Sequence, residues 1–199
     1  MTGMLLLFGT VTAAVFVAVL LAEGVRRPGY DPVYHTGSEL SLGERGWVQI
    51  ANFLQVGVGM LAFAAGVYLT LETTLGAVLL TIFGLGMIGA GMFLPDPIRG
   101  YPPGAPKGTP TAATRQHVAH GVIGGPVAFV AIFGACLVLA GQLDGSWRLY
   151  TILTAVAGLG LTIWTALAYQ RDAPNTGLVQ RALILVYLGW IVLLGIHLL

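Results

Sequence analysis

The sequence predicts an all-α integral membrane protein, a single bundle of six transmembrane helices. Three observations predict this fold class. The chain has 199 residues, of which 56% are hydrophobic and only 9% are charged, whereas a soluble domain carries about 25% charged residues. The apolar residues form six long runs, and a helix needs about 20 mostly apolar residues to cross a bilayer. The runs also lack the alternating pattern of a membrane β-barrel.

The six runs divide the chain into spans and loops. We expect one domain over residues 1–199, with helices at about residues 3–22, 47–70, 74–94, 116–141, 149–169 and 177–199. The first run is too long for the apolar core of a signal peptide, so we expect it to be retained. Clustered glycines in the third run favour tight helix packing. Pro126 should bend the fourth helix, because proline removes one backbone hydrogen bond.

The first loop carries two signals for the start of a helix. Residues 36–39 and 41–44 each fit a capping box, in which a hydroxyl and a carboxylate satisfy free backbone N–H groups. We therefore expect a short interfacial helix at about residues 38–42, followed by the second spanning helix.

Basic residues are concentrated on one side of the predicted membrane. All of them except Arg148 lie on the side of the odd-numbered loops. The positive-inside rule then places these loops in the cytoplasm and both termini outside. The same arginines can instead indicate a site for an anionic ligand, so that alternative stays open. The formal net charge of +1 argues against nucleic acid as a partner.

Polar residues also enter two of the spanning helices near the odd-numbered loops. Gln49, Asn52 and Gln55 are spaced three apart, and His117 and His120 repeat that spacing. Residues three apart share one face of a helix, and polar side chains in hydrocarbon usually face the bundle interior or a wet cavity. We expect a polar pocket between the second and fourth helices, open toward the odd-loop side. Hydrogen bonding between helices is the alternative explanation.

The leading functional hypothesis is an intramembrane enzyme that acts on a lipid or isoprenoid by acid–base chemistry. Burial at a lipid boundary raises the pKa of a carboxyl group, which can then donate a proton near neutral pH. Guanidinium groups bind phosphate oxygens bidentately and would hold an anionic head group. The candidate catalytic residues are Asp96, His117, His120, Glu39 and Asp31. The candidate substrate-binding residues are His35, Ser38, Glu44, Arg45, Gln49, Asn52, Arg99 and Arg115.

Three other functions are open. His117 and His120 are weak candidates for metal ligands of a zinc-dependent lipid hydrolase. The zinc-hydrolase helix motif has histidines four apart with a glutamate between them, and this chain has neither feature here. The leading hypothesis therefore requires no cofactor, and a divalent metal remains an alternative. A non-enzymatic lipid-binding or assembly protein is the second alternative. A small transporter is the third, although the chain shows no internal repeat.

Three motifs carry a family resemblance. They are Asp31-Pro32 followed by His35-Thr36-Gly37-Ser38-Glu39-Leu40, then Phe93-Leu94-Pro95-Asp96-Pro97, and the pair His117 and His120. Together they resemble a family of six-helix bacterial and archaeal membrane proteins catalogued as domain of unknown function 998, in which a proline usually replaces Leu94. The resemblance implies a six-helix bundle in a bacterial or archaeal cell membrane, and no established reaction.

The layout of this family is also distantly similar to that of small membrane terpene cyclases and of eukaryotic proteins that remodel lipid anchors. This similarity rests on architecture rather than on matched residues. It favours membrane lipids as partners and a hydrophobic small-molecule substrate that enters from the bilayer.

Overall fold

The computed structural model describes residues 1–108 and 112–199 of the chain. Within these ranges the fold is all-α, as predicted, and six helical spans are long and apolar enough to cross a membrane. The elements are α1 (Thr2–Arg26), the 3-10 helix η1 (Gly37–Ser41), α2 (Gly46–Leu71), α3 (Thr74–Met92), α4 (Arg115–Val122), the π-helical turn η2 (Ile123–Val127), α5 (Ala128–Ala140), α6 (Gly145–Gln170) and α7 (Thr176–Leu198).

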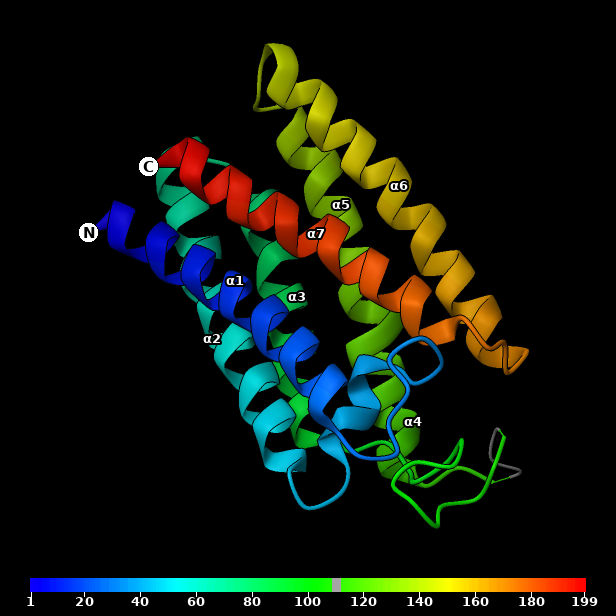
Figure 1. Ribbon diagram of the computed structural model, residues 1–199. Helices are drawn as coiled ribbons and strands as arrows, with labels where there is room; N and C mark the ends of the chain where they lie inside the picture. The colour runs from blue at the N-terminus through cyan, green and yellow to red at the C-terminus, as the bar shows by residue number, and fades with distance from the viewer. Residues whose placement is uncertain (109–111) are drawn as a thin grey trace.

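The helices form a bundle whose odd-numbered loops gather at one end (Figure 1). Helix α2 packs between α1 and α3, α7 lies along α1, and α5 packs on α3. The first loop, the loop before α4 and the α6–α7 turn meet at the same end, and the two termini lie together at the other end. This arrangement brings polar segments that are far apart in the sequence into one region.

Glycines set the close approach of α1, α2 and α3. A Cβ atom added to Gly59 would overlap the side chain of Thr12, and one added to Gly57 would lie 2.8 Å from the carbonyl oxygen of Gly84. Small residues allow such contacts between membrane helices. The tight packing predicted from the glycine clusters is confirmed on this side of the bundle.

The fourth span is bent where Pro126 was expected to bend it. Helix α4 passes into the π-helical turn η2 before α5 begins, and Gly125 has non-helical dihedral angles (φ −101°, ψ −106°). Proline cannot donate a backbone hydrogen bond and crowds the preceding turn. Because of the bend, α4 and α5 have different axes, and the surface that they present to α6 is not straight.

Helix α6 lies at the edge of the bundle, where it contacts α5 and α7 (Figure 1). Few of its 26 residues are buried, and these are concentrated in the half near the α5–α6 turn. Residues in the other half of α6 line a cavity, which is described below.

The first loop confirms one predicted helix start and corrects the other. Thr36 and Glu39 form the capping box of η1. The second box does not form, because α2 begins at Gly46 and its preceding residue makes no side-chain cap. A turn at Gly43 (φ +74°) separates Ser41 from the first turn of α2, and only a residue directly before a helix can cap it.

Candidate functional site

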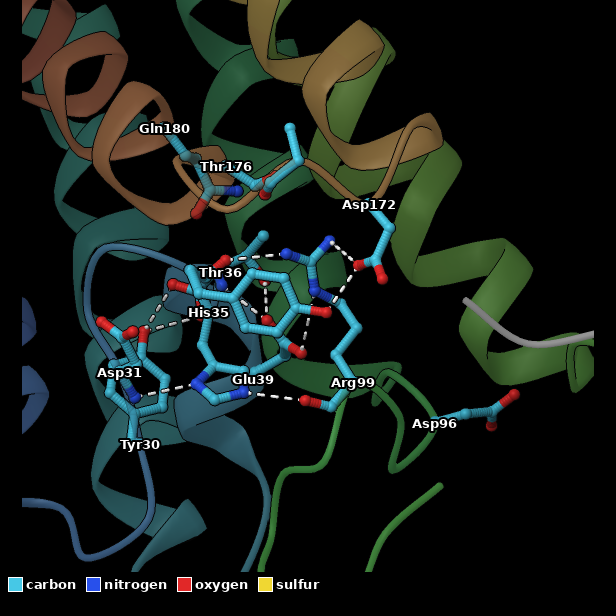
Figure 2. A network of polar contacts seen from close by, with 12 residues as sticks. Tyr30, Asp31, His35, Thr36, Glu39, Asp96, Arg99, Asp172, Thr176 and Gln180 are labelled. Carbon is cyan, nitrogen blue, oxygen red and sulfur yellow. Dashed lines mark hydrogen bonds and ion pairs between the residues drawn. The ribbon is translucent and has the colours of Figure 1, made fainter. Parts of the chain in front are cut away.

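Arg99 lies at the centre of the polar end of the bundle (Figure 2). Its side chain is fully buried, with Nη1 3.4 Å from Asp172 Oδ1 and Nε 3.9 Å from Glu39 Oε1. Nη2 donates a hydrogen bond of 2.9 Å to the Tyr34 carbonyl oxygen, and the guanidinium carbon lies 4.0 Å from the centre of the Tyr34 ring. Arg99 thereby joins the first loop, the loop before α4 and the α6–α7 turn.

His35 is buried in the same network and uses both ring nitrogens within the protein. The Asp31 N–H donates to Nδ1 at 2.8 Å, and Nε2 lies 3.0 Å from the Arg99 carbonyl oxygen. Because Nδ1 accepts, the proton of the neutral ring is on Nε2 and is donated to that carbonyl. The carboxylate of Asp31 is itself used by the Val33 N–H. These contacts hold the first loop against the loop before α4.

Arg181 ties α7 to the first loop, a role that the sequence analysis missed. Nη1 donates to the carbonyl oxygens of Pro32, His35 and Gly177, and Nη2 donates to the Tyr30 hydroxyl. The signal was present in the sequence, because an arginine inside an apolar span usually has a specific partner. Tyr34 and Asp172 were also missed, since loop contacts between distant segments leave no local pattern.

Glu39 lies between this network and a cavity. Its side chain is 2% exposed, and Oε2 accepts hydrogen bonds from the backbone N–H and the hydroxyl of Thr36. Oε1 has no hydrogen-bond partner within residues 1–108 and 112–199. Burial raises the pKa of the Glu39 carboxyl group above its ordinary value, although the Thr36 hydrogen bonds oppose the shift.

Asp96 is turned away from Arg99 (Figure 2) and anchors the start of α4. Its carboxylate accepts hydrogen bonds from the Thr114 N–H (2.8 Å) and the Thr114 hydroxyl (2.6 Å). Burial alone would raise the pKa of Asp96, but these hydrogen bonds outweigh that effect and the pKa is lowered. We expected Asp96 to exchange protons with a substrate; in the structure its carboxylate is engaged at the N-terminus of α4.

The hydrogen bonds of His117 and His120 place the ring proton on different nitrogens. The Asp96 N–H donates to Nδ1 of His117 at 2.9 Å, so the proton of the neutral ring is on Nε2. Nδ1 of His120 lies 2.7 Å from the Phe93 carbonyl oxygen and 3.1 Å from that of Ala90, so it carries a proton and Nε2 accepts. These tautomers follow from the partners of each nitrogen. One helix face therefore presents an N–H donor and a nitrogen acceptor.

Both histidines line a cavity of about 490 Å³ between α4–α5 and α6, a volume within the usual range for ligand sites. Val130 and Ile163, on opposite walls, are 58% and 53% exposed. The cavity therefore opens on the side of the bundle that lipid would cover. Its polar lining residues are Thr36, Ser38, Glu39, His117, His120, Thr162, Thr165, Tyr169, Gln170 and Gln180.

The polar face of α2 meets α1 rather than the fourth span. The Asn52 side chain donates to the Phe16 carbonyl oxygen at 3.1 Å, and that of Gln55 donates to the Thr12 carbonyl oxygen at 3.1 Å. The amides of Asn52 and Gln55 are therefore taken up by α1 and do not line a pocket between the second and fourth helices. The spacing correctly predicted a shared face, but α1 approaches closely enough to take up the amides. Gln49 lines a separate hollow of about 30 Å³.

The remaining candidates divide between the cavity and the surface. Ser38 lines the cavity. Arg45 pairs with Glu23 at the start of α2. Glu44 and Arg115 are exposed.

The two histidines have no third partner for a metal ion in the described part of the chain. Within residues 1–108 and 112–199, no group of three or more His, Cys, Asp or Glu side chains is placed to hold one. Nδ1 of each histidine is also engaged with the backbone. The zinc-dependent alternative would require ligands from outside this arrangement, such as water or substrate.

Comparison with known proteins identifies a family. No curated protein and no solved structure matches the chain. The model of one family matches residues 10–197, nearly the whole chain, and includes the first loop, the Asp96 motif and the histidine pair. The chain therefore belongs to the family described as protein of unknown function DUF998.

Proposed function

We propose that this multi-pass membrane protein is an enzyme that binds a lipid or isoprenoid in the lateral cavity and acts on its polar end by acid–base chemistry. One observation carries the proposal. His117 and His120 both line the cavity, and Nδ1 of each is held by a hydrogen bond to the backbone, which leaves an N–H donor at Nε2 of His117 and an acceptor at Nε2 of His120. The family resemblance favours a bacterial or archaeal cell membrane as its location.

The two histidines suit different parts of a proton transfer. Nε2 of His120 can take a proton from the substrate, because its lone pair is unprotonated and Nδ1–H is held by two carbonyl oxygens. Nε2–H of His117 can hydrogen-bond the oxygen on which negative charge develops, as a neutral histidine does in other enzymes. His120 then returns the proton to the product, so both rings end as they began. Isomerisation, cyclisation and other lipid modifications are reactions of this kind.

Access to the cavity favours a substrate that is dissolved in the bilayer. Phe129, Val130, Ile163 and Leu183 provide an apolar lining, and the histidines lie toward the odd-loop end. An amphiphile entering between α5 and α6 would place its tail among the apolar residues and its polar end beside the histidines. Hydrophobic burial would drive entry of a chain that water excludes.

The test compares lipid extracts from cells that express the wild type, His117→Asn, His120→Asn or an empty vector. An asparagine amide can replace the Nδ1 hydrogen bond of either histidine, with its oxygen accepting or its nitrogen donating, but it places nothing at Nε2. We expect untargeted mass spectrometry to reveal a species that changes only with active protein. His197→Asn is the matched control, because His197 stacks on Trp147 at the other end of the bundle.

Identical lipid profiles from all five cultures, with every variant inserted and folded, would contradict the enzyme proposal. Lipid that co-purifies with the wild type but is unchanged in the cell would instead favour the non-enzymatic lipid-binding alternative.

A further inference from the structure

The charge and hydrogen-bonding capacity of the cavity point to a particular polar group on its ligand. We infer that the cavity selects an amphiphile that ends in an uncharged hydroxyl, a lipid or isoprenoid alcohol, over the corresponding phosphate or amine. This inference rests on the proposed use of the cavity and goes further by naming the substrate class.

The cavity offers no cation for a phosphate. Among the described lining residues, Glu39 is the one formally charged side chain apart from the histidines. Phosphate binding requires arginine, lysine or an array of N–H groups. An anionic head group would lose its hydration beside a carboxylate, which is costly in a medium of low dielectric constant.

The arginines expected to hold an anionic head group are occupied or distant. Arg99 is fully buried, where it faces Glu39 and Asp172. Arg45 is paired with Glu23, and Arg115 is exposed on the first turn of α4. None of the three belongs to the lining that the structure describes.

A cationic amine would complement only half of the site. An ammonium group has three donors and no acceptor. It could donate to Nε2 of His120, but it would leave Nε2–H of His117 without an acceptor. Leaving a sheltered donor without a partner costs free energy. The Glu39 carboxylate also already faces a cation, because Nε of Arg99 lies 3.9 Å from Oε1.

A hydroxyl group has both of the functions that the two histidines require, one donor and one acceptor. Its O–H can donate to Nε2 of His120 while its oxygen accepts from Nε2–H of His117. The adjacent wall includes a further uncharged residue, Thr165, whose buried hydroxyl has no hydrogen-bond partner among the residues that the structure describes. An alcohol would therefore bring no unbalanced charge to the site.

The binding test uses head groups that differ on a common tail. The purified full-length chain in detergent micelles is titrated with farnesol, farnesyl phosphate and farnesylamine, and with dodecanol, dodecyl phosphate and dodecylamine. Native mass spectrometry measures the occupancy of each complex. In each series that binds, we expect the alcohol to bind at least tenfold more tightly than the phosphate and the amine. Tightest binding of a phosphate or an amine, equal binding, or no binding of either alcohol would overturn the inference.

Two matched pairs of variants localise the effect. Gly121 lines the cavity with nothing within 4 Å of an added Cβ, and Gly160 on α6 has the same freedom outside the lining. Gly121→Leu should lower alcohol occupancy at least tenfold, and Gly160→Leu should leave it unchanged. His120→Asn should reduce the preference for alcohol over phosphate, and His197→Asn should not. Unchanged occupancy in Gly121→Leu would show that the alcohol binds elsewhere and would overturn the inference.

The outcome separates this inference from the enzyme proposal. Selective binding of alcohols without any change in cellular lipids would support the head-group inference and contradict the enzyme. A lipid phosphate that is consumed only by the wild type would support the enzyme and contradict the head-group inference.

Discussion

Two regions of this molecule carry polar residues with the same spacing and use them differently. On α2, Asn52 and Gln55 are three apart and donate to carbonyl oxygens of α1. On α4, His117 and His120 are also three apart, but each uses Nδ1 on the backbone and both residues line the cavity. The difference lies in the neighbouring helix, because α1 packs directly on α2 while the nearby half of α6 borders open space.

The comparison teaches that spacing identifies a shared helix face and leaves its neighbour undetermined. Where glycines bring two helices close together, polar side chains become interhelical hydrogen bonds. Where a kink and exposed glycines keep the next helix apart, the same pattern can line a site. The kink at Gly125–Pro126 and the open surface at Gly121 belong to the second region.

The largest expected effect is at Arg181, which braces the loop that closes the polar end of the cavity. Arg181→Met would leave the Pro32 carbonyl oxygen and the Tyr30 hydroxyl oxygen without their donor. It would also remove one of the two hydrogen bonds to the His35 carbonyl oxygen, which the Tyr30 hydroxyl would still reach. We expect the free energy of unfolding in mixed micelles to fall by about 3 kcal/mol or more.

Arg148→Met is the control for this prediction. Arg148 pairs with Asp144 and donates from Nε to the carbonyl oxygens of Ala140 and Leu143, but its side chain is 51% exposed. Water can replace partners at an exposed site, so the loss should be smaller than at Arg181. Equal losses in the two variants would show that Arg181 does not brace the first loop.

The second-largest expected effect is a difference in stability between two glycine variants, one in each region. Gly59→Leu would drive a side chain into Thr12 on α1, and overpacking of this kind costs about 3 kcal/mol. Gly121→Leu has free space and should change the free energy of unfolding by less than about 0.5 kcal/mol. Thermal unfolding of both variants in the same detergent measures the contrast. If Gly59→Leu were as stable as Gly121→Leu, the two regions would not differ in packing as described.

Much of the fold could be predicted because bilayer thickness fixes the length of apolar helices. The six spans, the bend at Pro126 and the capping box of Thr36 and Glu39 all left local signals in the sequence. These features depend on residues that are neighbours along the chain.

The arrangement of the candidate site could be predicted only in part. His117, His120, Ser38 and Glu39 were selected from the sequence and line one cavity. The partner of the α2 polar face could not be predicted, because helix order in space depends on packing between distant segments. The contacts of Arg99 with Tyr34 and Asp172 depend on loop conformation in the same way.

A smaller effect tests whether the two polar faces are independent. Asn52→Leu should cost about 1 kcal/mol, the usual scale of a hydrogen bond between membrane helices. Asn52 and His120 share no hydrogen-bond partner in the described part of the chain. The loss in Asn52→Leu/His120→Asn should therefore equal the sum of the single losses within about 0.5 kcal/mol.

The pair Asn52 and Gln55 is the positive control for that cycle, because their side chains are hydrogen-bonded to each other at 3.2 Å. In their double variant, the loss in the free energy of unfolding should therefore differ from the sum of the single losses. Strong coupling between Asn52 and His120 instead would mean that the histidine belongs to the structural network of α2.

The smallest expected effect is the pH dependence contributed by Asp96, which positions the histidine helix. The lowered pKa of Asp96 means that the folded state binds this proton less readily than the unfolded state. Its stabilisation is therefore complete above the unfolded pKa and is lost as the pH falls through the folded pKa. Asp96→Asn should lower the free energy of unfolding by about 1 kcal/mol or less at neutral pH, with the difference from wild type vanishing in acid.

Unfolding measured across a pH series tests this sign, and Thr114→Val provides the matched comparison. That variant removes the hydroxyl that donates to Asp96 at 2.6 Å and keeps the backbone donor. It also removes the cap that the hydroxyl provides to the His117 N–H, a loss that does not depend on pH. The pH dependence attributable to Asp96 should therefore shrink without disappearing, because one of its two hydrogen bonds remains. A difference between Asp96→Asn and wild type that grows toward acid would mean that Asp96 is protonated more readily in the folded protein. In that case Asp96, rather than the histidine pair alone, would be available to donate a proton at this end of the bundle.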